Sequence, residues 1–178
     1  MATQTGPSLS ASDVYRQKMF VLLGDQDPLA VLSETGSKLS DIVAGHSTAI
    51  LRGRPFADKW TPNEIIGHLT DSEWVYGYRL RLILSEENPT ILGTQQDRWV
   101  ARQGHNEREP SELVDVFRTL RQLNLATWRR TSPADLARAG LHNERGPESL
   151  GVMLRLLAGH DLSHVDQIMR YIRAVSQG

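Results

Sequence analysis

The strongest constraint on the fold is a regular spacing of residues near the C-terminus. From about Pro147 to Val175 the pattern predicts one long helix, in which one stripe of residues recurs in alternating steps of four and three. The stripe consists of Leu150, Leu154, Leu157, Asp161, His164, Ile168, Tyr171 and Val175. Such spacing holds one face of a helix against its neighbours, so it is typical of helices that pack side by side in a bundle.

Prolines and capping residues mark where other helices begin. Proline is tolerated at the first helical position because its missing N–H would have no partner there. At Thr61-Pro62, Glu64 follows Thr61 by three residues, which predicts a capping box, and Trp60 can pack against Ile65. Apolar residues then recur at helical spacing, as in the third long segment with its stripe of Leu113, Val116, Leu120 and Leu123.

Together these patterns predict an all-α four-helix bundle with short accessory helices. The four main helices are expected near residues 28–44, 61–87, 110–130 and 147–175. A leading helix is expected near 12–23, and short helical pieces near 94–102 and 133–138. No segment alternates apolar and polar residues as a half-buried strand would.

Length and composition limit what such a bundle can do. We interpret the 178 residues as a disordered leader over 1–11 and a single domain over 12–178. A net charge of −1 argues against a nucleic-acid-binding protein, and the absence of cysteine excludes disulfides and cysteine nucleophiles. No apolar run approaches the ~20 residues of a membrane span, and the N-terminus lacks an apolar signal core. We therefore expect a cytoplasmic protein without a membrane partner.

A polar break interrupts the stripe of the last helix. Asp161 and His164 lie at its middle, with His160 beside them, and buried polar groups of this kind are costly unless they are paired or metal-bound. His160 and His164 are four residues apart and therefore lie one turn apart on one helix face. His68, on the capped helix, supplies a third imidazole. Three neutral imidazoles can bind one divalent ion, with Zn²⁺ or Ni²⁺ expected and positions left open.

Other residues could support this centre. Asp71 follows His68 by three residues and could orient a ligand or act as a base, although an exposed acid on a helix surface is an equally good interpretation. Asp161 could accept a ring N–H from a ligand histidine. Gln167 could line the cavity or connect helices. We interpret His46, His105 and His142 as ordinary exposed histidines, although the loop that contains His142 could fold over the site, and Trp99 could contact substrate.

Two segments together resemble a known family. Residues 60–69 (WTPNEIIGHL) resemble the segment of the DinB/YfiT-like superfamily that carries its first histidine ligand. Residues 159–168 (GHDLSHVDQI) resemble its closing segment, which carries two more. The resemblance implies a four-helix bundle of up-up-down-down type in which His68, His160 and His164 bind the metal. It also implies relatives that are often dimers and that include S-transferases and isomerases dependent on bacillithiol or mycothiol, and metal-dependent hydrolases.

Three functions therefore remain open from the sequence. The leading expectation is a metal-dependent, thiol-dependent S-transferase that joins a low-molecular-weight thiol to a small electrophile. The second is a hydrolase in which the ion activates water. The third is a metal-binding stress-response module without catalysis, and the histidines could also be only structural. A homodimer is possible in each case.

Overall fold

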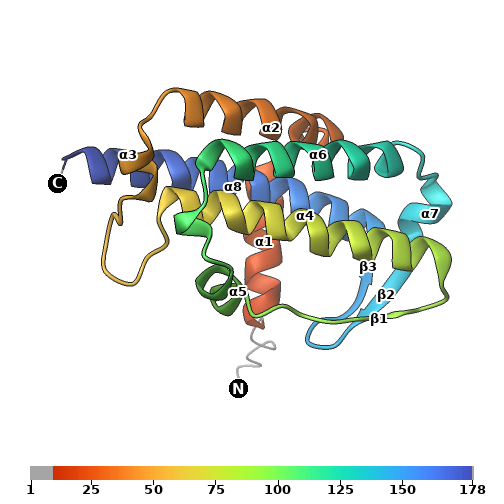
Figure 1. Cartoon of the computed structure of the whole chain (residues 1–178). Helices are drawn as coiled ribbons and strands as arrows, with labels where there is room; N and C mark the ends of the chain where they lie inside the picture. The colour runs from red at the N-terminus through yellow and green to blue at the C-terminus, as the bar shows by residue number, and fades with distance from the viewer. Residues whose placement is uncertain (1–9, 178) are drawn as a thin grey trace, which may run out of the picture.

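Four long helices form a bundle in the computed structural model, which describes residues 10–177 (Figure 1). They are α2 (Pro28–Ala44), α4 (Pro62–Ser85), α6 (Pro110–Trp128) and α8 (Leu150–Gln177). The predicted capping box is present in α4, where the Thr61 and Glu64 side chains each accept a hydrogen bond from the other residue's backbone N–H. The expected all-α four-helix bundle is confirmed.

Shorter elements connect and flank the bundle. The leading helix α1 (Ala11–Leu23), α5 (Gln96–Gln103) and α7 (Pro133–Ala137) were predicted, whereas α3 (Thr48–Arg52) and the 3-10 helix η1 (His105–Glu107) were not. Apart from Ser10 and Ala11, which begin α1, the leader expected over residues 1–11 lies outside the described residues. Within residues 10–177, none of the helices combines the length and apolar character needed to cross a membrane.

The order of helix directions differs from the predicted one. The short strands that follow α4 and α6 pair with each other, and Arg138, just after α7, donates to the Ile83 carbonyl near the end of α4. The C-terminal ends of α4 and α6 therefore lie at the same end of the bundle. Successive long helices run up, down, down and up, as Figure 1 shows. Helices α4 and α6 run in the same direction because the connection between them, residues 86–109, returns along the length of the bundle.

A small sheet was not predicted from the sequence. Strand β1 (Thr90–Ile91) pairs in parallel with β2 (Ala139–His142), and β2 pairs antiparallel with β3 (Gly146–Ser149). These strands have two to four residues each, too few for an alternating pattern to stand out. The last helix therefore begins at Leu150 rather than at Pro147, because residues 146–149 pair with β2.

The core has two apolar clusters, one toward each end of the bundle. The cluster near the sheet is centred on Leu32, Leu80 and Trp128, and the other on Leu39, Phe117 and Ile168. In α6 the buried face differs from the predicted stripe, since Leu123 is 59% exposed. The face that is buried contains Leu113, Phe117, Arg121, Asn124, Leu125 and Trp128. Two polar residues therefore occupy core positions between the clusters.

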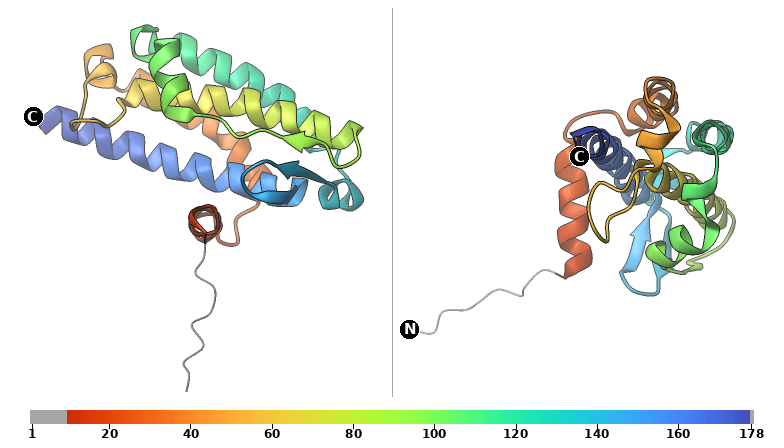
Figure 2. Two further views of the ribbon diagram at one scale, coloured as in Figure 1. Left: turned by 90° about the horizontal axis from the view of Figure 1, so that it is seen from below. Right: turned by 60° about the vertical axis from the view of Figure 1, so that its left-hand side comes forward.

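Helix α1 crosses α8 at a steep angle instead of running along it, as both figures of the whole chain show (Figure 2). The crossing is close because Gly159 of α8 has no side chain. A Cβ atom at this position would lie 2.2 Å from the carbonyl oxygen of Met19, whose side chain is buried in the contact. Gly159 thus sets how closely α1 approaches the middle of α8.

This close approach predicts that Gly159→Ala lowers the free energy of unfolding by about 1–3 kcal/mol, because backbone cannot move aside as a flexible side chain can. Urea denaturation measures the effect. Gly36→Ala in α2 is the matched control, since its Cβ would meet the flexible Arg118 side chain at 3.1 Å. If both variants have equal stability, the crossing at Gly159 is not a packing constraint.

Candidate metal centre

The three predicted histidines meet in the middle of the bundle. His68 comes from α4, and His160 and His164 come from consecutive turns of α8. One ligand nitrogen from each lies within 4.8 Å of the others, and the Nε2 atoms of His68 and His160 are 3.0 Å apart. In a tetrahedral zinc site two ligand nitrogens lie roughly 3.3 Å apart, so the cluster has the dimensions of a metal centre.

The surroundings keep the imidazoles of His68 and His164 neutral. Burial lowers the pKa of His68 far below its usual range, and the neighbouring His160 and His164 lower it further. Burial, together with His160, lowers the pKa of His164 to about 3. A neutral imidazole keeps a lone pair on one nitrogen, which is the form that binds a metal ion.

Two neighbours orient the rings. Gln167 Oε1 lies 2.8 Å from His164 Nδ1, so the amide oxygen accepts a hydrogen bond from the N–H of the ring. The lone pair of the other ring nitrogen, Nε2, is then available to bind a metal ion. Trp60 covers the site, with its ring centroid 4.9 Å from that of His68 and 6.5 Å from that of His164. The sequence left the role of Gln167 open, and the structure places it against a predicted ligand.

A buried ionic network lies directly behind the histidines. Arg121 of α6 donates to Glu73 Oε1 of α4 at 2.8 Å and to Asp161 Oδ2 of α8 at 2.7 Å. It also donates to the Leu32 carbonyl of α2 at 2.7 Å, and Asn124 donates to Glu73. Burial raises the pKa of Asp161, but the Arg121 guanidinium and the neighbouring His160 together outweigh this effect and lower the pKa to about 2. The network therefore joins all four long helices.

This network carries one more carboxylate than guanidinium, and its excess negative charge lies beside the histidines. Asp161 Oδ1 and His160 Nδ1 are both buried without a hydrogen-bond partner among the described residues, and they are 4.0 Å apart. That separation is too long for the hydrogen bond expected of Asp161, so its role toward a ligand stays a prediction. A divalent ion bound by the three histidines would be attracted by this negative charge, so the residues present fit such an ion.

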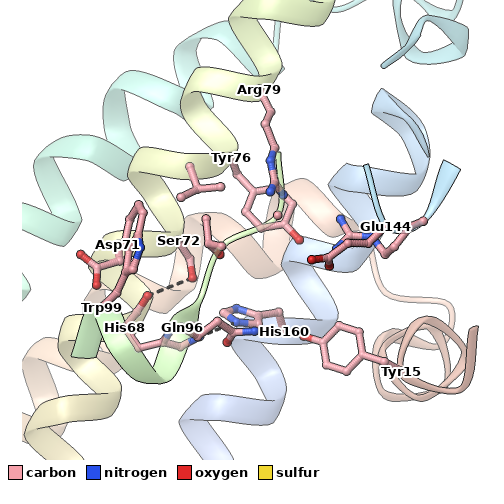
Figure 3. Close-up of a pocket in the computed structure, with 14 residues that line it drawn as sticks. Tyr15, His68, Asp71, Ser72, Tyr76, Arg79, Gln96, Trp99, Glu144 and His160 are labelled. Carbon is pink, nitrogen blue, oxygen red and sulfur yellow. Dashed lines mark hydrogen bonds between the residues drawn. The ribbon is translucent and has the colours of Figure 1, made fainter. Parts of the chain in front are cut away.

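A pocket of about 130 Å³ opens beside two of the predicted ligands, His68 and His160 (Figure 3). Arg79 of α4, Trp99 of α5 and Glu144 of the β2–β3 turn also line it. The sequence suggested that the loop containing His142 could fold over the site, and Glu144 of this loop does line the pocket. His142 itself is buried in β2, not exposed as predicted.

Asp71 lies at the wall of this pocket, as its spacing from His68 suggested, but its partners were not foreseen. Its Oδ2 lies 2.8 Å from His105 Nε2 and accepts a hydrogen bond from Gln103 at 3.1 Å. His105, predicted to be exposed, is 2% exposed. The signal that could have located it is Gly67, because a Cβ at that position would lie 2.2 Å from the His105 ring.

The contact of Gln167 with His164 predicts that Gln167→Leu weakens metal affinity about 10–100-fold, because the ring loses the acceptor that orients it. Competition with a chromophoric chelator measures the affinity. Asp166→Asn, at the neighbouring exposed position of α8, is the control and should bind as the wild type does. Equal affinity of Gln167→Leu and wild type would contradict this role.

The buried network predicts that Arg121→Met lowers the free energy of unfolding by about 3–5 kcal/mol, since Glu73 and Asp161 would remain buried without a cation. Urea denaturation again measures the loss. Removing the exposed Lys38–Glu34 pair by Lys38→Met should change stability by no more than about 1 kcal/mol. A loss for Arg121→Met as small as that for Lys38→Met would show that the network does not hold the helices together.

Comparison with known proteins agrees with this arrangement. A candidate metal-dependent hydrolase of Oceanobacillus iheyensis is 31% identical over 110 residues, which are 61% of this chain and 63% of that protein. The chain thus spans less than two thirds of the length of this relative.

Solved structures share the fold. YfiT of Bacillus subtilis, described as a probable metal-dependent hydrolase with an unusual four-helix bundle topology, superposes with a TM-score of 0.77. The two chains are 22% identical, and the superposition covers 96% of this chain and 91% of YfiT. A mycothiol-dependent maleylpyruvate isomerase superposes with a TM-score of 0.57 and 14% identity, over 88% of this chain and 62% of the isomerase.

The model of one protein family matches most of the bundle. It extends over residues 32–168, from the second turn of α2 to beyond the last of the three histidines. The match therefore includes the capped start of α4, the buried network and all three ligand positions. This chain belongs to the DinB superfamily.

Proposed function

We propose that this protein is a metal-dependent enzyme that acts on a small molecule. His68, His160 and His164 would bind one divalent ion, with zinc or nickel expected. The observation that carries the proposal is the pocket that two of these imidazoles, those of His68 and His160, line. A module that only stores or senses metal needs no such pocket, so the pocket counts against the non-catalytic alternative.

The residues around the pocket have distinct tasks in this proposal. When bound, the ion acts as a Lewis acid that lowers the pKa of the attacking nucleophile. Asp71 could accept a proton within the pocket, and its hydrogen bonds to His105 and Gln103 keep its carboxylate in place. Trp99 forms part of the wall and limits access of water to the site.

The reaction class that we favour is thiol transfer, in which a low-molecular-weight thiol is the nucleophile and a small electrophile accepts its sulfur. Its support is the resemblance of the two histidine segments to a family with thiol-dependent members, and a fold shared with a mycothiol-dependent isomerase. Hydrolysis is the second candidate. It is favoured by the name of the sequence relative and by Asp71, which could take a proton from water.

The cytoplasm remains our expectation for the location of the enzyme, and a homodimer is one possible assembly. Fractionation of the source cells would test the location, and size-exclusion chromatography with light scattering the assembly.

Elemental analysis and a two-substrate assay test the proposed function. We expect the purified protein to take up about one equivalent of zinc or nickel, and His164→Ala to lose this uptake. With the metal-loaded protein, small thiols should react faster with 1-chloro-2,4-dinitrobenzene than without protein. Hydrolysis of p-nitrophenyl acetate in the absence of thiol would instead favour the hydrolase.

His46→Ala is the matched control, since His46 lies outside the cluster with its Nδ1 2.8 Å from the Ile42 carbonyl oxygen. It should keep both metal uptake and activity. If the wild type takes up no more metal than His164→Ala does, the three histidines are structural and the proposal is wrong.

A further inference from the structure

One buried charge in the pocket has no role in the metal centre. Arg79 follows His68 by eleven residues on α4, lines the same pocket, and is only 5% exposed. Its Nη2 donates to the Leu92 carbonyl at 2.6 Å. Among residues 10–177, no carboxylate oxygen lies within 4.0 Å of its guanidinium.

The other two arginines near the site form ion pairs with carboxylates of the protein. Arg121 contacts Glu73 and Asp161, and Arg145, which also lines the pocket, donates from two nitrogens to Glu148 Oε2. Arg79 therefore differs from both. A buried guanidinium remains charged, and burying such a charge is costly unless an anion balances it.

The position of Arg79 is held by its neighbours. Its guanidinium carbon lies 5.4 Å from the centroid of the Tyr76 ring, a separation typical of a cation–π contact. The hydrogen bond to Leu92 fixes one nitrogen and leaves the others for a ligand. Of the carboxylates that line the pocket, Asp71 is occupied by His105 and Gln103, and Glu144 lies outside ion-pair distance of Arg79.

We propose that Arg79 binds a carboxylate group of the small molecule whose reacting atom lies at the histidine centre. The inference rests on the proposed function and extends it by naming a substrate class. A carboxylate suits this site because the planar guanidinium offers parallel N–H donors to its two oxygens. Substrates would thus be organic acids rather than neutral compounds.

The geometry also sets the shape of such a substrate. Eleven residues of helix separate the Cα atoms of His68 and Arg79 by roughly 16 Å along the axis, and the Arg79 side chain leans back toward His68. Figure 3 shows the two residues at opposite ends of the pocket. The carboxylate and the reacting atom therefore lie at opposite ends of an extended molecule.

Matched ligands test this inference by binding, without any assay of activity. Suberic acid monohydroxamate and octanohydroxamate share a metal-binding hydroxamate and a chain of eight carbons, but only the first ends in a carboxylate. Isothermal titration calorimetry on the zinc-loaded full chain should show the acid binding at least about tenfold more tightly, because charge-assisted hydrogen bonds contribute about 1.5–3 kcal/mol.

Substitutions then assign the preference to Arg79. Arg79→Met should bring the affinity for the acid down to that of octanohydroxamate and leave octanohydroxamate unaffected, whereas Arg79→Lys should keep part of the preference. Arg173→Met, at an exposed position of α8, should behave as the wild type does. Circular dichroism and zinc content verify that each variant is folded and loaded.

The outcomes separate the two proposals. If the wild type binds both compounds equally, or if Arg79→Met keeps the preference for the acid, the carboxylate site is wrong and the metal centre stands. If the wild type binds neither compound, the open metal position is wrong and the substrate site falls with it. The wild-type comparison alone decides the question should Arg79→Met fail to fold.

Discussion

The ionic network of Arg121 with Glu73 and Asp161 determines how the middle of this bundle is assembled. One guanidinium of α6 contacts side chains of α4 and α8 and a carbonyl of α2. Asp161 is the neighbour of His160 in sequence, and Glu73 lies on the same helix as His68. The network therefore sets the register between α4 and α8, and with it the distance between the histidines. Because a buried charge without a partner is costly, other registers of these helices are strongly disfavoured.

The polar layer around this network divides the core into two apolar clusters. The clusters supply the burial that drives folding, whereas the layer between them is polar and contains the ionic network and the three histidines. Its excess of one negative charge would attract the cation that we propose for the three histidines. A buried charge needs a partner of opposite charge. For Arg121 the partners are Glu73 and Asp161 of the protein itself. Arg79 has no carboxylate of the described residues within ion-pair distance, and the same rule therefore leads to a carboxylate ligand.

The fold was largely predictable because the four long helices carry local signals. The capping box at Thr61 and the stripe of α8 correctly indicated α4 and α8, and the spacing of His160 and His164 put both on one face. In α6 the apolar stripe predicted the wrong face. The face that is buried contains two polar residues, Arg121 and Asn124, which an apolar pattern cannot reveal. The sheet could not be predicted because its strands are too short to show an alternating pattern. The directions of the helices could not be predicted either, because they depend on one long connection.

By itself the sequence determined the helices, the capped start of α4 and the three candidate ligands, because these follow from spacings within a turn or two of chain. Only the tertiary structure decided which distant residues face one another. It paired His105 with Asp71, placed Gln167 against His164 and left Arg79 unpaired in the pocket. These relations join residues from separate helices, turns and loops, or depend on how one side chain is oriented. The packing of the whole chain sets them, and no local pattern encodes them.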